Sequence, residues 1–173
     1  VLYLYEPVDE FVMTSLAKYA DKDLVSADNS DIELEDVSSA KKKKSLSKKD
    51  SDALCEWIKE TLGESVNEVS VSKRLVDSPA IALNADKVMT PSMRRMMKAM
   101  KQDTNMQKSV NLEINSKHDL IKNLSALKDT DAETAKLVSE QILDNALISA
   151  GYLEDPRDMV SRVYQILERV SAK

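Results

Sequence analysis

The residues best suited to covalent chemistry are few, because the chain of 173 residues has one cysteine, Cys55, and one histidine, His118. A thiolate activated by a histidine base is a common nucleophile, and both side chains are common zinc ligands. Cys55 stands among apolar residues, where cysteine usually acts as a small buried hydrophobe. No nucleophile is placed beside His118 by spacing, and one pair of ligands is too few for the usual zinc sites. We expect His118 to pack or hydrogen-bond locally near the start of a helix.

A phosphate-binding loop is not expected either, because the chain has two glycines, Gly63 and Gly151. Loops that cradle phosphates need several glycines close together. Carboxylates, hydroxyls and lysines are plentiful, but none stands at a recognisable catalytic spacing. The sequence therefore predicts that this chain is not an enzyme and has no catalytic, metal-binding or cofactor-binding residues of its own.

Methionines form the most unusual pattern. The segment TPSMRRMMKAMKQD runs from Thr90 to Asp103, and Thr90 with Pro91 is a good helix start. Positions i, i+3, i+4 and i+7 of that helix share one face. The methionines at those positions, with one that extends the row, are Met93, Met96, Met97, Met100 and Met89. Arginines and lysines occupy most of the other side.

This methionine face has three interpretations. It could pack in the core, since burying one Met side chain contributes about 1.5–3 kcal/mol. It could hold copper through thioethers, although no other ligand is nearby. It could also be an exposed, adaptable surface for apolar segments of other proteins, because Met is unbranched and polarizable.

The composition is that of a globular protein, with 42% hydrophobic and 32% charged residues. The formal net charge of −5 disfavours nucleic acid as a partner. A lone cysteine fits a reducing compartment, and no apolar run reaches the roughly 20 residues of a membrane helix. The chain opens with VLYLY and has no initiator Met, from which we expect a piece of a longer protein.

Hydrophobic periodicity predicts an α+β fold with a small mixed sheet and several helices. Residues 1–5 read as a buried strand, Pro7 opens a helix with an apolar face at Val8, Phe11, Val12, Leu16 and Tyr19, and residues 24–27 read as a second strand. Residues 28–49 are strongly charged and are expected to form a linker, with a lesser alternative that the lysine run is a nucleic-acid-binding or targeting patch. Further strands are predicted around Val66–Val71, at 80–83 and at 110–115.

Helices account for the rest of the predicted fold. One is expected from a cap at Asp50 or Ser51 to Leu62, closed by Gly63, and another from a cap at Ser116 over 118–127. The last two span 132–150 and 156–171. Both are too apolar to cover only each other, so they either pack on the upstream sheet or pair with a second copy as a four-helix bundle.

Five segments in order resemble the C-terminal part of the ninety-kilodalton heat-shock chaperone family. They are VLYLYEPVDEFVMTSL, RLVDSPAIAL, MRRMMKAM, LEINSKHDLIKNL and QILDNALISAGYLEDPRDMVSRVYQIL. The resemblance covers the chain apart from residues 28–49. It implies that 1–27 end a middle domain, that 28–49 are a flexible charged linker and that 50–173 form a C-terminal dimerisation domain.

The resemblance implies a homodimeric, ATP-dependent stress-response chaperone that binds partly folded clients. Its nucleotide site, with ATP and magnesium, would lie in domains upstream, so this chain would not hydrolyse ATP. Client contact would involve the five methionines named above. The dimer interface, between the last two helices of each copy, would include Leu143, Ala146, Leu147, Val160, Val163, Tyr164, Leu167 and Val170. The alternative is a purely structural dimerisation module whose methionine helix is buried and touches no client.

The ending ERVSAK differs from the acidic tail by which cytosolic members recruit tetratricopeptide-repeat co-chaperones. It also lacks the retention signal of the endoplasmic-reticulum members. The segment ALISAGYLEDPRDMV is more similar to the mitochondrial or bacterial branch, which implies the mitochondrial matrix, another organelle or the bacterial cytoplasm. The family's usual proline after LEIN is Ser116 here, so the rigidity of that turn does not carry over from the resemblance.

Overall fold

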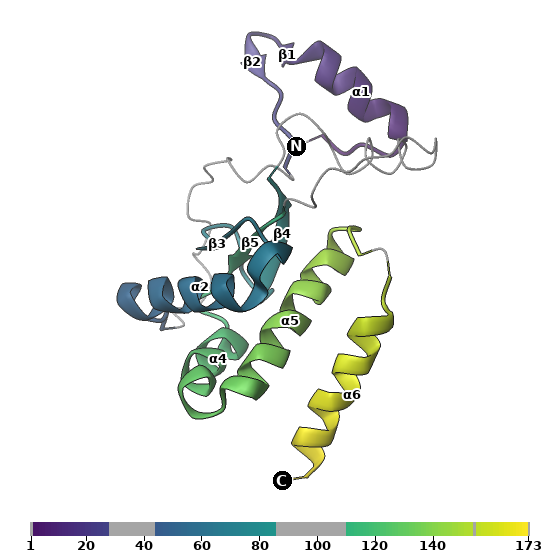
Figure 1. Cartoon of the computed structure of the whole chain (residues 1–173). Coiled ribbons are helices and arrows are strands. Elements are labelled where there is room, and N and C mark those ends of the chain that lie inside the picture. Colours follow the sequence, from purple (N-terminus) through teal and green to yellow (C-terminus); the bar gives the residue numbers. More distant parts are fainter. Residues whose placement is uncertain (1, 28–43, 86–109, 154, 173) are drawn as a thin grey trace.

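A computed structural model describes residues 2–27, 44–85, 110–153 and 155–172 (Figure 1). The elements are α1 (Pro7–Leu16), β1 (Lys18–Tyr19), β2 (Lys22–Asp23), α2 (Lys48–Leu62), the 3-10 turn η1 (Gly63–Ser65), β3 (Glu68–Val71), β4 (Ala80–Asn84), β5 (Val110–Ile114), α4 (Asp119–Thr130), α5 (Ala132–Ser149) and α6 (Arg157–Ser171). The predicted α+β class with a small mixed sheet is confirmed for these residues, which include five α-helices.

Strand β5 is the centre of a three-stranded sheet. It pairs in parallel with β3 and antiparallel with β4. Alternate residues of β5 point to one face, and on that face Val110, Leu112 and Ile114 are buried. The predicted strands at 80–83 and 110–115 are therefore confirmed, and the strand predicted around Val66–Val71 begins at Glu68.

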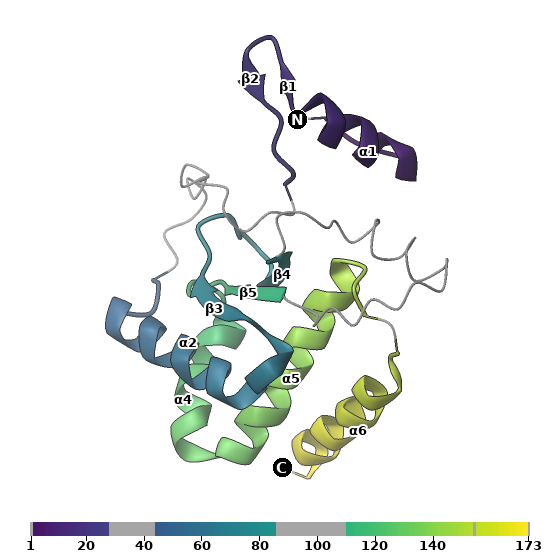
Figure 2. The same ribbon diagram turned by 45° about the horizontal axis from the view of Figure 1, so that its top comes forward.

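Helices α2, α4 and α5 supply the core that covers this sheet (Figure 2). Their apolar residues recur at helical spacing, so each helix presents one stripe to the strands. The buried members are Leu54, Cys55, Ile58 and Leu62 of α2, Ile121 and Leu124 of α4, and Ala135, Ile142, Leu143 and Ala146 of α5. This core makes the three helices and the sheet one packed body.

The predicted cap of α2 is wrong by about one turn. Ser47 is the N-cap: its Oγ accepts a hydrogen bond from the Asp50 backbone N–H at 3.1 Å and donates to Asp50 Oδ2 at 2.6 Å. Asp50 and Ser51 both lie inside the helix, and Ser51 is buried. The predicted end is confirmed, since Gly63 closes α2 with a φ of +55°, a conformation that favours glycine.

The predicted cap of α4 is also wrong. His118, rather than Ser116, caps the helix, because its Nδ1 accepts the Leu120 backbone N–H at 3.1 Å. Ser116 is buried and holds the entry to α2 instead. Its Oγ pairs with the Ser45 hydroxyl at 2.7 Å, and its carbonyl accepts the Leu46 N–H.

The N-terminal residues fold differently from the prediction. Residues 2–5 and 24–27 are not strands, and the two short strands are β1 and β2, which form a hairpin. Helix α1 does begin at Pro7, but Tyr19 lies in β1 rather than on the helical face. Leu2, Tyr3 and Tyr5 are exposed. An apolar stretch becomes a strand only where a partner strand supplies hydrogen bonds, and residues 2–5 have none within the described ranges.

Candidate interaction site

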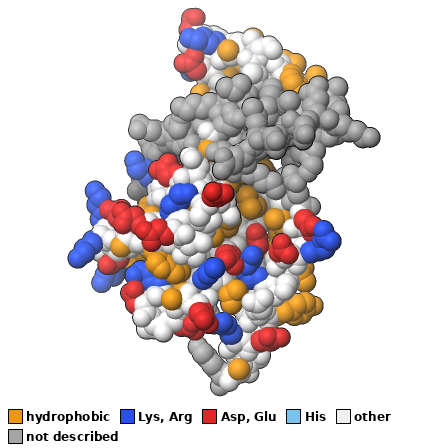
Figure 3. Space-filling model, viewed as in Figure 1, with side chains coloured by type: hydrophobic (Ala, Val, Ile, Leu, Met, Phe, Trp, Pro, Cys, Tyr) orange, Lys and Arg blue, Asp and Glu red, His pale blue; other side chains and the backbone are white. Residues whose placement is uncertain are grey.

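Helix α6 carries an apolar face that the rest of the described chain does not cover. Its residues recur at i, i+4, i+7 and i+10, which places them along one side of a helix. Their exposed fractions are 48% for Val160, 62% for Tyr164, 55% for Leu167 and 67% for Val170. Hydrophobic side chains show on the surface where α6 lies (Figure 3). We call these four residues the α6 apolar face.

The remaining side of α6 lies against α5. The two helices are joined by a turn in which Gly151 takes a φ of +71° and the Tyr152 N–H donates to the Leu147 carbonyl at 2.7 Å. Met159, Val163 and Ile166 are half-buried, and no residue of α6 is fully buried.

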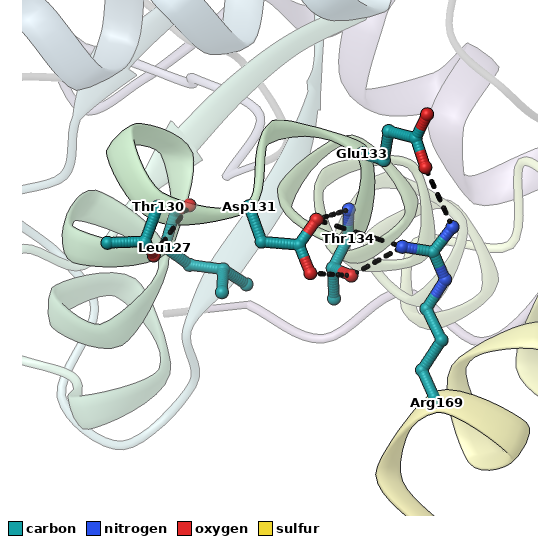
Figure 4. A network of polar contacts seen from close by, with 6 residues as sticks. All are labelled: Leu127, Thr130, Asp131, Glu133, Thr134 and Arg169. Atoms are coloured by element: carbon teal, nitrogen blue, oxygen red, sulfur yellow. Dashed lines mark hydrogen bonds and ion pairs between the residues drawn. The ribbon is translucent and has the colours of Figure 1, made fainter. Parts of the chain in front are cut away.

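Ion pairs complete the contact between these helices. The Arg162 guanidinium donates to Glu140 Oε2 at 2.9 Å and also contacts Asp144. Arg169 reaches the first turn of α5, where it contacts Glu133 at 3.3 Å and the Thr134 hydroxyl at 2.6 Å (Figure 4). The sequence prediction missed these contacts. The available signal was the spacing of seven residues between Arg162 and Arg169, which repeats between Glu133 and Glu140.

The residues predicted for a dimer interface do not all lie on one surface. Leu143 and Ala146 are buried in the core of their own chain and offer no area to a partner in this conformation. Leu147 packs partly against that core, and Val163 is half-buried. The other four are the α6 apolar face.

The methionines predicted to contact clients lie outside the described residues. They are Met89, Met93, Met96, Met97 and Met100. The two strands that flank this segment are neighbours, because Asn84 of β4 pairs with Val110 of β5. The chain therefore leaves and re-enters the sheet at one end.

The structure gives Cys55 and His118 local roles. The pKa of the Cys55 thiol is raised to about 11, chiefly by burial and to a smaller extent by the nearby Asp52 and Glu56 carboxylates. The thiol is therefore neutral near pH 7, which disfavours nucleophilic attack. His118 caps α4, as described above. Among the described residues no group of His, Cys, Asp and Glu is placed to hold a metal ion, and no helix is long and apolar enough to span a membrane.

Comparison with known proteins assigns the family. The family model described as "Hsp90 protein" matches residues 1–172. The chain belongs to the Hsp90 family of heat-shock chaperones. It is 44% identical to the chaperone protein HtpG of Desulfitobacterium hafniense over 98% of its own length and 27% of that relative. It is 32% identical to the mitochondrial TNF receptor-associated protein 1 homolog of Dictyostelium discoideum, covering all of this chain and 24% of that protein.

A plastid relative matches as well. The chloroplastic heat shock protein 90-5 of Arabidopsis thaliana is 34% identical over 96% of this chain and 22% of its own length. The family predicted from sequence is thus confirmed, and its relatives include bacterial, mitochondrial and chloroplast proteins. The chain spans about a quarter of the length of these relatives.

Proposed function

We propose that this chain is the C-terminal dimerisation and client-binding region of an Hsp90-family chaperone. The observation that carries the proposal is the exposed α6 apolar face on a chain of this family. Residues 1–27 would end the middle domain, and the linker predicted at 28–49 would join it to the dimerisation domain predicted at 50–173. Because α2 begins at Lys48 and Leu46 packs against the core, the dimerisation domain would include the last residues of that predicted linker.

The proposed occupant of the α6 apolar face is a second copy of the chain. A two-fold axis brings the same face of both copies together, so a continuous apolar side of one helix can cover itself. Pairing of α5 and α6 with their copies would give a four-helix bundle. The four exposed side chains are large, and their burial at an interface would contribute about 25 cal/mol for each Å² of apolar surface.

Sedimentation of the chain tests dimerisation. We expect a dimer at micromolar concentration, and we expect Tyr164→Ser with Leu167→Ser to shift it to monomer while the helix content holds. Phe11→Ser is a matched control, because this residue is also an exposed apolar side chain on a helix, α1. A wild-type monomer at micromolar concentration would rule out the proposed dimer.

Client binding is proposed for the methionine segment, on the basis of its spacing and of family membership. Replacing Met93, Met96, Met97 and Met100 by Ser should leave the thermal unfolding temperature unchanged and reduce the prevention of client aggregation. A fall in thermal stability with that substitution would favour the alternative of a structural module with a buried methionine helix.

The parent protein would bind and hydrolyse ATP with magnesium in domains outside this chain. We propose that the isolated chain has no ATPase activity, which a phosphate-release assay tests. From the relatives, the proposed compartment is the bacterial cytoplasm, the mitochondrial matrix or another organelle. Proposed partners are a second copy and partly folded clients, with no nucleic acid or membrane.

A further inference from the structure

The ion pairs between α5 and α6 lie on the side of α6 opposite to its apolar face. Residues two positions apart in a helix are separated by roughly 200° around the axis. Arg162 stands two positions after Val160, and Arg169 stands two positions after Leu167. Each arginine therefore points almost directly away from an exposed apolar residue.

Helix α5 repeats the same arrangement. Glu133, Glu140 and Asp144 form one acidic row, and a core residue follows each of them two positions later: Ala135, Ile142 and Ala146. The acidic row thus lies opposite to the side of α5 that packs in the core. Arginines on one helix meet carboxylates on the next, and the apolar sides of both helices point outward from this contact.

The contact of Arg162 with α5 is more buried than that of Arg169. The side chains of Arg162, Glu140 and Asp144 are 18%, 27% and 16% exposed. A guanidinium that bridges two carboxylates fixes both distance and rotation, because its donors form a rigid fork. Arg169 is more exposed, but it contacts three groups at the start of α5: Asp131 at 3.8 Å, Glu133 and the Thr134 hydroxyl (Figure 4).

We propose that Arg162 and Arg169 are positioning residues for chain association. They hold α6 on the acidic row of α5 and so keep the α6 apolar face turned outward for a second copy. Without them, the hydrophobic effect would favour rotation of α6 about its axis until that face covers α5 of the same chain. A chain rotated in this way cannot pair, so the apparent association constant falls with the fraction of chains in the outward state. This inference rests on the proposed dimer.

Sedimentation equilibrium of the full chain carrying Arg162→Gln tests the inference. We expect the dimer dissociation constant to rise about tenfold, which is the size of a charge-assisted contact of roughly 1.4 kcal/mol. Arg157→Gln is the matched control, because it removes the same charge from the same helix. Arg157 is 87% exposed and pairs with Asp155 in the preceding turn rather than with α5. We expect its dissociation constant to stay within about twofold of wild type, as for an exposed pair.

The salt dependence of the dimer dissociation constant is a second measurement, and loss of apolar packing alone would not change it. Raising the sodium chloride concentration from about 0.05 M to about 0.5 M should weaken wild-type association, because salt screens the partly exposed ion pairs. The same change should have less effect on Arg162→Gln. If Arg162→Gln loses helix content, the double variant Arg162→Glu with Asp144→Arg, which exchanges the two charges, is measured instead. Association of this double variant as strong as that of wild type supports the inference.

The outcomes separate the two proposals. A wild-type monomer overturns the dimer and this inference together. A wild-type dimer whose dissociation constant is unchanged by Arg162→Gln overturns only the role of the arginines. Equal weakening by Arg157→Gln and Arg162→Gln, or failure of the charge exchange to restore association, also overturns it.

Discussion

Helices α5 and α6 follow each other in the chain and are both rich in apolar residues, but they are stabilised differently. Helix α5 buries Ala135, Ile142, Leu143 and Ala146 in the core against the sheet. Helix α6 buries none of its residues fully and meets α5 through arginines and half-buried side chains. Two segments with similar apolar content can thus serve the fold of one chain and, as we propose, the association of two.

The difference lies in which side each helix turns toward the sheet. Helix α5 lies beside strand β4 and helices α2 and α4 (Figure 2). Its buried apolar residues belong to the core that these elements share, and its carboxylates contact α6. The acidic side of α5 is the surface that remains for α6 to pack against. The arginine side of α6 carries the opposite charge, so it is the side that pairs with α5. The charge pattern of α5 therefore determines which side of α6 remains exposed.

The largest expected effect comes from the core side of α5. Leu143→Ala should lower the free energy of unfolding by about 3 kcal/mol, because it removes buried methyl groups and leaves a cavity. Urea denaturation, at a protein concentration low enough for wild type to be monomeric, measures this. A loss below about 1 kcal/mol would mean that α5 is not an integral part of the core.

The pH dependence of stability tests the burial of Cys55 in the same core. Burial raises its pKa to about 11 in the folded chain, above the ordinary value of 9.0. Its contribution to stability is therefore fully present below about pH 9 and is lost as the pH rises toward and through 11, since the unfolded thiol releases its proton first. Wild type should lose more stability than Cys55→Ala between about pH 8 and pH 11. Thiolate absorbance of the folded chain with a midpoint near pH 9 would contradict this burial.

A smaller effect on the free energy of unfolding is expected at the start of α5, where Arg169 of α6 contacts it. Asp131 caps α5, since Oδ1 accepts the Thr134 N–H at 3.0 Å and Oδ2 accepts the Thr134 hydroxyl at 2.6 Å. Asp131→Ala should cost about 1 kcal/mol, as for loss of an N-cap. Asp129→Ala is the control, because it removes the same charge nearby from an exposed pair with Lys128. Equal losses from both variants in urea denaturation would show that charge, rather than the cap, matters.

The smallest effect on folding is expected on the α6 apolar face. Leu167→Ala should change the free energy of unfolding of the monomer by less than about 0.5 kcal/mol, as for a surface substitution. The substitution is chemically the same as Leu143→Ala, so the pair compares the two helices directly. Under the proposed function, sedimentation should show weaker association of Leu167→Ala. A loss similar to that of Leu143→Ala at low protein concentration would show that α6 belongs to the core.

Local patterns predicted much of the fold. Alternation in residues 110–115 predicted β5, Gly63 predicted the end of α2, and periodic apolar residues predicted α5 and α6 within a few positions. The helix caps were less predictable, because Ser47, Asp50 and Ser51 are all able to accept a backbone N–H. The local hydrogen bond expected of His118 near the start of a helix is confirmed. Sequence alone assigned the cap to Ser116, because the hydrogen bonds that engage Ser116 come from the distant residues Ser45 and Leu46.

The candidate site was also predicted in part from the sequence. Its four exposed residues are among the interface residues that the family resemblance implied, but Leu143 and Ala146, named beside them, are in the core. Periodicity by itself determined that α5 and α6 each have an apolar side and that arginines and carboxylates stand opposite to those sides. Only the tertiary structure decided which apolar side is buried within the chain. Burial depends on which surfaces β4, α2 and α4 present in three dimensions, and no local pattern in either helix contains that information.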